Sequence, residues 1–186
     1  MPKDDRYDDI KSMLKKQKIR TFRDIFRYVP PSVVAIDLVI EKRRFSKLID
    51  HPGGFKIKNV IRLSELCNIT ITEMATLVEA GYPKDKKEVN KHKDERYDVI
   101  RSRFDDKKIT HLEDIFVRIP KSKVAEDIGR KPDRFISLVD HDVQNFYVRD
   151  IVAIGRLCEL TIVEMFQLVE AQYIKQKSLV VLNTKP

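Results

Sequence analysis

Four cationic residues lie within one short stretch of the chain, and their types and spacing suit them to bind phosphate. Lys42, Arg43 and Arg44 are consecutive, and Lys47 follows about one helical turn later. Lysine and arginine pair with DNA phosphates, and an arginine can donate two hydrogen bonds to the O6 and N7 atoms of guanine. The residues therefore indicate contact with duplex DNA, and a solvated basic face on an ordinary helical hairpin is an equally open interpretation.

The stretch from residue 31 to residue 51 is predicted to position these cations by forming two short helices with a tight turn at Val39 and Ile40. Apolar residues at helical spacing give each helix a buried side: Val34, Leu38, Phe45 and Leu48. The small Ala35 lets the second helix cross closely over the first, as a helix-turn-helix unit requires. The cations then lie on the exposed side of the second helix.

The pattern occurs twice, because residues 6–82 align on residues 96–173 with one extra residue near Asn145. Matching pairs recur along the whole length: Tyr7 with Tyr97, Phe26 with Phe116, Phe45 with Phe135, Asp50 with Asp140, and Cys67 with Cys158. A repeat of this size indicates a tandem duplication. We therefore expect an all-α chain of two tandem five-helix helix-turn-helix domains joined by a short polar linker.

Further polar residues flank the basic stretch in each repeat. Ser32 is expected to cap the first helix with its hydroxyl group, beside backbone amides that can hold a phosphate. Lys56 and Lys58 lie at the predicted start of a later helix, where Tyr147 and Arg149 are their counterparts. The predicted DNA-contacting residues are Ser32, Lys42, Arg43, Arg44, Lys47, Lys56 and Lys58 in the first repeat, and Ser122, Lys123, Arg134 and Arg149 in the second.

The repeats set the expected boundaries: a first domain at 1–82, a linker at 83–95, a second domain at 96–173 and a tail at 174–186. Residues 1–82 hold 16 Lys+Arg against 11 Asp+Glu, net +5, whereas residues 96–173 hold 13 against 14, net −1. Their different charges indicate different roles. The tail contains a β-prone apolar run, Leu179 to Leu182, which is expected to dock on a repeat or to serve in self-association.

Several functional classes are not expected from this composition. Cys67 and Cys158 lie inside apolar helical patterns, which is typical of small core residues and not of a disulfide framework. No histidine has a Cys or His partner at metal-ligand spacing, so neither a metal nor a cofactor is expected. An enzyme is not expected either, because the chain lacks a nucleophile with an adjacent base and a Gly-rich phosphate loop.

The sequence also predicts a cytoplasmic protein without membrane association. No apolar run approaches the roughly 20 residues that a membrane span needs. The first residues, Met1 to Asp9, are polar and of mixed charge, so they resemble neither a signal peptide nor a transit peptide.

The run from Val124 to Gly129, followed by the run from Arg134 to Leu138, resembles the lambda-repressor-like DNA-binding domains of the Cro and phage-repressor type. The resemblance extends over both repeats. It implies base-facing positions at Lys42, Arg43 and Lys47 in the first repeat, and at Lys131, Asp133 and Ser137 in the second. A carboxylate such as Asp133 repels phosphate and can accept a hydrogen bond only from a cytosine amino group.

Two residues depart from that family's pattern. Val39 stands where the family usually has a turn glycine, and a β-branched residue disfavours a positive φ there. Arg130 stands in the second repeat where an apolar residue is usual.

Together these features favour a DNA-binding transcriptional regulator in which the first repeat dominates affinity. The second repeat would contact another half-site or modulate binding. The alternative is a protein–protein interaction module on the same scaffold, with DNA contact partly lost and a protein bound through the second repeat or the tail. The oligomeric state stays open.

Overall fold

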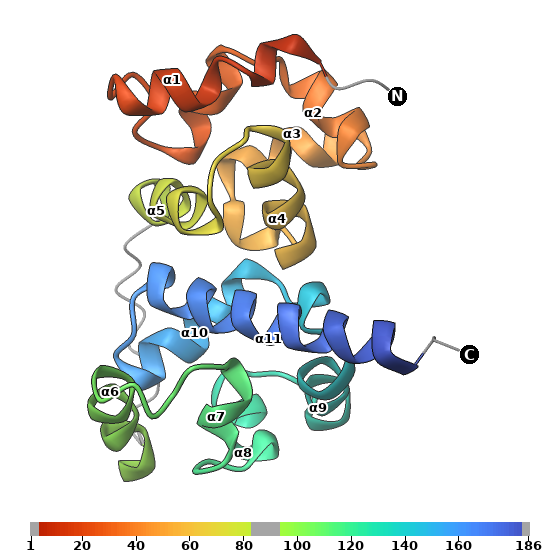
Figure 1. Cartoon of the computed structure of the whole chain (residues 1–186). Coiled ribbons are helices and arrows are strands. Elements are labelled where there is room, and N and C mark those ends of the chain that lie inside the picture. The colour runs from red at the N-terminus through yellow and green to blue at the C-terminus, as the bar shows by residue number, and fades with distance from the viewer. Residues whose placement is uncertain (1–3, 83–93, 184–186) are drawn as a thin grey trace. The chain divides into compact units, whose positions relative to one another are not determined.

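The computed structural model describes residues 4–82 and 94–183, with side chains up to residue 178 (Figure 1). Every regular element in these residues is a helix, which confirms the all-α class. The described chain divides into two compact units, one formed by residues 4–82 with residues 147–149, and the other by residues 94–146 and 150–183. Most of the predicted linker lies outside the described residues, but Asp94 and Glu95 belong to the first turn of the second unit.

The first unit is a succession of short helices, with η denoting a 3-10 helix. In chain order they are η1 (Asp5–Tyr7), α1 (Ile10–Lys15), η2 (Phe22–Arg27), α2 (Pro31–Asp37), α3 (Lys42–Asp50), η3 (Pro52–Gly54), α4 (Ile57–Leu66) and α5 (Ile71–Gly81).

The second unit repeats this order at the aligned positions. Its elements are η4 (Glu95–Tyr97), α6 (Asp98–Asp105), α7 (Leu112–Phe116), α8 (Lys121–Asp127), α9 (Pro132–His141), η5 (Val143–Asn145), α10 (Val148–Cys158) and α11 (Ile162–Asn183). The main difference is the last helix, which is one continuous element through residue 183 and is the long blue helix of Figure 1. Residues 174–183, assigned to a β-prone tail by the sequence pattern, therefore continue α11.

Each unit closes around an aromatic cluster that anchors α3 or α9. Phe45 is fully buried, and its ring lies edge-on to the rings of Phe26 and Phe55, with centroids 5.5 and 5.7 Å away. Phe135 is 2% exposed and makes the same kind of contact with Phe116 at 5.7 Å and Phe146 at 5.3 Å. The expectation that these two phenylalanines are buried anchors is confirmed.

Some expected core positions are different in the structure. Leu48 and Leu138 are only partly buried, and Val139, 1% exposed, lies deeper in the second unit. Cys67 and Cys158 are both buried as thiols, as expected for small core residues.

A buried tyrosine fastens the start of each unit to the helix before the turn. The Tyr7 hydroxyl donates to the carboxylate of Asp37, the last residue of α2, at 2.8 Å, and Tyr97 donates to Asp127 of α8 at the same distance. Burial, followed by these hydrogen bonds, raises the pKa of both tyrosines. Both hydroxyls therefore stay protonated as donors.

The helix starts match the sequence signals in one place and depart from them in another. Thr70 and Glu73 form a capping box, in which Glu73 N–H donates to the Thr70 hydroxyl at 3.1 Å, and Thr161 and Glu164 form the same box. In contrast, Ser32 and Ser122 do not cap α2 and α8. Those helices begin one residue earlier, at Pro31 and Lys121, because Pro30 and Pro120 occupy the N-cap positions and leave the serines inside the first turn.

Three helices in each unit end with one residue in the left-handed conformation. These residues are Gln17, Val39 and Asn68 in the first unit, and Lys107, Gly129 and Glu159 in the second, with φ between 52° and 68°. After α2, Val39 N–H donates to Ile36 O at 3.0 Å and Ile40 N–H donates to Ala35 O at 2.8 Å. This pair of bonds is the Schellman motif, which satisfies the last carbonyls of a helix. Val39 therefore adopts the positive φ that its β-branched side chain disfavours, held there by these two backbone hydrogen bonds.

The two turns after α2 and α8 give a matched test of backbone strain. Replacing Val39 by glycine should stabilise the first unit by about 1 kcal/mol, because it relieves about 1–2 kcal/mol of left-handed strain, and the larger conformational entropy that glycine loses on folding offsets only part of this gain. Gly129→Val should destabilise the second unit by about 1–2 kcal/mol, since a Cβ at Gly129 meets no atom within 4 Å and only the strain remains. Thermal melts of both variants would contradict this account if the two shifts had the same sign.

Candidate nucleic-acid interface

The helix α3 separates its apolar and basic residues onto different faces. Phe45 is fully buried, while Lys42, Arg43, Arg44 and Lys47 are all exposed. Arg43 and Lys47 are four residues apart, and Arg44 and Lys47 are three apart, so their side chains are neighbours on the helix surface. The structure therefore places the four predicted cations together on solvent-facing parts of one short helix.

The two arginines of this cluster, Arg43 and Arg44, differ from most other arginines of the first unit because no carboxylate of the described chain pairs with them. Four other arginines of the first unit face carboxylates: Arg6 with Asp4 at 2.7 Å, Arg23 with Asp50 at 3.3 Å, Arg27 with Asp24 at 3.4 Å, and Arg62 with Glu65 at 3.2 Å. Arg20 donates to the carbonyl oxygen of Gln17 at 3.1 Å. Arg43, Arg44 and Lys47 form no ion pair with any residue of the described chain.

The placement of these charges also opposes the helix dipole. The helix α3 begins at Lys42, so Lys42, Arg43 and Arg44 occupy its first turn, which contains no acidic residue and receives no side-chain cap. Cations at a helix N-terminus are unfavourable by about 0.3–1 kcal/mol each at the surface. A polyanion bound at this face would remove both this repulsion and the repulsion among the cations.

The remaining predicted residues of the first unit lie apart from this cluster. Ser32 is exposed in the first turn of α2, Lys56 precedes α4 and is partly exposed, and Lys58 is exposed in the first turn of α4. All three belong to other elements than the four cations of α3, so they are not members of the cluster.

The equivalent region of the second unit has a different charge pattern. Lys131, Asp133, Arg134 and Ser137 are exposed on α9 or at its start. Asp133 occupies the position of Arg43, and Asp140 in the same helix pairs with Lys121. Lys123 pairs with Asp127 at 2.5 Å. The cations around α8 and α9 are thus partly neutralised by carboxylates of the same unit.

Two further cations of the second sequence repeat, Arg149 and Arg130, also have partners. Arg149 is exposed, and its guanidinium carbon lies 4.8 Å from the centre of the Tyr147 ring. Arg130, the departure from the family pattern, donates from Nε to the carboxylate of Asp150 at 2.7 Å. Asp150 is 5% exposed. The aligned residues of the first unit are Ile40 and Asn59, so an apolar and an amide side chain have been exchanged together for an ion pair.

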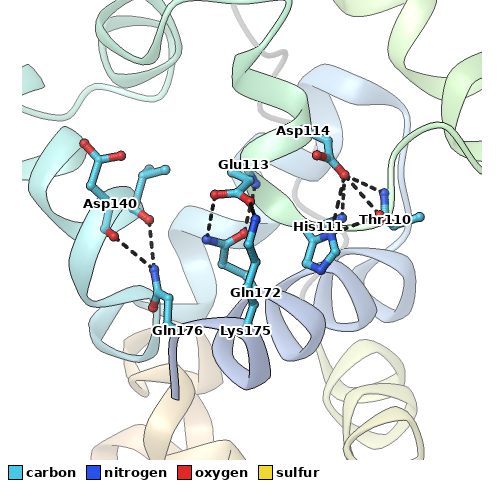
Figure 2. A network of polar contacts seen from close by, with 9 residues as sticks. Thr110, His111, Glu113, Asp114, Asp140, Gln172, Lys175 and Gln176 are labelled. Carbon is cyan, nitrogen blue, oxygen red and sulfur yellow. Dashed lines mark hydrogen bonds and ion pairs between the residues drawn. The ribbon is translucent and has the colours of Figure 1, made fainter. Parts of the chain in front are cut away.

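A polar network that the sequence did not predict holds α11 against the rest of the second unit (Figure 2). Gln176 donates to the carbonyl oxygens of Val139 and Asp140, at 3.2 and 3.3 Å, and so satisfies carbonyls near the end of α9. Gln172, 3% exposed, donates to the Glu113 carboxylate at 3.1 Å. The residue aligned with Gln172 is Gly81, where α5 ends, so the described residues of the first unit hold no counterpart of the Gln172 contact.

Lys175 belongs to the same network, and its ion pair with Glu113 lowers the pKa of that carboxyl. Lys175→Met should lower the melting temperature of the second unit slightly at neutral pH, because a partly exposed ion pair contributes little to stability. The lowered pKa means that this stabilisation is complete above the ordinary pKa of glutamate and is lost as the pH falls through the folded-state value. Melts in a series from neutral pH downward should therefore show the difference between Lys175→Met and the native chain shrinking once the pH falls below the ordinary pKa of glutamate. Lys177→Met is the matched control, and an equal loss in both variants would contradict the assignment.

Three further findings concern possible metal sites, membrane spans and similarity to known proteins. In residues 4–82 and 94–178, no group of three or more His, Cys, Asp or Glu side chains is arranged to hold a metal ion. None of the described helices combines the length and apolar character needed to cross a membrane. Comparisons of the chain with protein-family models, with curated proteins and with solved structures find no match.

Proposed function

We propose that this protein is a DNA-binding transcriptional regulator in which the first unit supplies most of the affinity. The observation that carries the proposal is the exposed cluster on α3, whose cations form no ion pair within the described chain and of which Lys42, Arg43 and Arg44 oppose the helix dipole. Phosphates would neutralise this cluster, and Arg43 has the chemistry to contact a guanine edge. The proposed role is binding and not catalysis.

The arrangement of α2 and α3 supports a helix-turn-helix unit of the lambda-repressor-like kind. Ala35 and Val34 are fully buried in α2, Phe45 is fully buried in α3, and a tight Schellman turn joins the two helices. In this proposal α3 enters the major groove with its N-terminal residues facing the bases. The linker then lets the second unit contact a neighbouring half-site.

The second unit suits a modulating role or a protein partner. Asp133 and Asp140 lie on α9 where the first unit has Arg43 and Asp50, and Lys121, Lys123 and Arg130 are all paired with carboxylates. A surface with these charges binds phosphate poorly and is better suited to a protein with exposed cations. This observation favours protein interaction as the second candidate function, restricted to this unit.

The proposal is tested by titrating the intact chain with random-sequence duplex DNA at several salt concentrations and enriching the bound sequences. If the four cations of α3 each replace one counterion, log K should fall with log salt concentration with a slope of about −3.6, from roughly −0.9 per phosphate contact. Enrichment of a defined site would support regulation. Absence of binding at low salt would overturn the proposal.

A further inference from the structure

Val39 is an unusual residue in the turn between α2 and α3. It is 93% exposed, although it is apolar, and it is β-branched with a φ of 54°. Ile36, one turn earlier in α2, is 50% exposed. The two residues are linked by the backbone bond from Val39 N–H to Ile36 O, so their side chains project from the same end of the helix.

The second unit shows that the turn does not require this side chain. There the same backbone conformation and the same hydrogen bonds are formed by Gly129, and Glu126 occupies the position of Ile36. A Cβ added to Gly129 would meet no atom within 4 Å, so the turn leaves its side chain in open space. In the first unit valine thus carries backbone strain and exposes apolar surface without a packing benefit inside the protein.

We propose that Val39 and Ile36 form an apolar contact with duplex DNA beside the basic face of α3. The inference rests on the proposed function and adds a contact that charge does not provide. Val39 lies just before Lys42, the first residue of α3, so a duplex held by the cations of α3 comes close to the turn. Duplex DNA offers apolar groups there, namely the C5-methyl group of thymine at the groove edge and the carbons of deoxyribose. The second unit, which lacks the basic cluster, also lacks the apolar pair.

The decisive variant is Val39→Gly in the intact chain. It should melt at a higher temperature than the native protein and yet bind its enriched DNA site about four- to fifteenfold more weakly, the range for losing burial of one or two methyl groups. The slope of affinity against salt should stay unchanged, because an apolar contact releases no counterions. Val39→Asn, which tolerates the left-handed conformation, should weaken binding to the same extent.

The matched control is Gln17→Gly, because Gln17 has the same left-handed conformation, with a φ of 55°, at the end of α1. It should stabilise the first unit without changing DNA affinity. Replacing single thymines of the site by deoxyuridine then distinguishes the two apolar groups. If Val39 contacts a thymine methyl group, one of these replacements should weaken DNA binding by the native chain and leave binding by Val39→Gly unchanged. If Val39 contacts deoxyribose, no replacement should weaken binding by the native chain.

The outcomes separate this inference from the proposed function. If the native chain binds no DNA, the proposed function fails and this inference fails with it. If the native chain binds and both Val39→Gly and Val39→Asn bind equally well, the apolar contact alone is overturned.

Discussion

Reversing the charges of Arg43 and Lys47 to glutamate in the intact chain is expected to lower its affinity for duplex DNA on the order of 100-fold near physiological salt. Both side chains are exposed on α3 without an ion-pair partner in the described chain, so each is available to a phosphate. Loss of two phosphate contacts should also reduce the salt slope by about 1.8. Fluorescence anisotropy across a salt series measures both quantities.

The matched control for this pair is Lys11→Glu with Lys15→Glu on α1. These two lysines are also exposed and also four residues apart, so the change in net charge and the spacing are the same. If affinity depends only on the overall charge of the chain, both double variants should lose the same affinity. The account requires a much larger loss for the α3 pair, and equal losses would contradict it. Circular dichroism melts would verify that both remain folded.

Phe45→Ala is expected to destabilise the first unit by about 3–5 kcal/mol, because it leaves a cavity at the centre of the aromatic cluster. Phe45 has no exposed surface, and two other rings lie edge-on against it. Phe135→Ala should have an effect of the same size in the second unit. Thermal unfolding monitored by circular dichroism, with unit-resolved NMR signals, would assign each loss to its unit.

Leu48→Ala on α3 provides the comparison for Phe45→Ala, since Leu48 is only partly buried. Leu48→Ala should lower the free energy of unfolding of the first unit clearly less than Phe45→Ala does. A Phe45→Ala variant as stable as the native chain would show that α3 is not anchored through this ring. DNA binding by Phe45→Ala should fall through unfolding and recover at temperatures where the variant is folded.

Local side-chain chemistry made much of the fold predictable. The apolar spacing around Phe45 and Phe135 identified the buried faces of α3 and α9, because a short helix has few ways to bury one large ring. The capping boxes at Thr70 and Thr161 identified the starts of α5 and α11, since their hydrogen bonds link residues three apart in sequence. The position of the four cations on the exposed side of α3 followed from the same periodicity.

The features that could not be predicted depend on contacts between residues distant in sequence, or on backbone strain that hydrogen bonds elsewhere in the turn offset. Val39 adopts a positive φ because two backbone hydrogen bonds after α2 hold it there, and no sequence rule for valine anticipates this. Residues 174–178 are helical, and two of them contact distant parts of the chain. Lys175 pairs with Glu113 of α7, 62 residues away, and Gln176 donates to Asp140 of α9, 36 residues away. Asp150 is the buried partner of Arg130, and only the folded chain brings these two residues together.

In the proposed function, α3 makes most of the contact with DNA and α9 makes less of it. The most direct measurement is an NMR titration of the isotope-labelled intact chain with its enriched duplex, following the backbone amides of both helices. The account predicts large shift changes from Val39 to Lys47 and much smaller changes from Gly129 to Ser137. Changes confined to the stretch from Gly129 to Ser137, with α3 unaffected at saturating DNA, would contradict it.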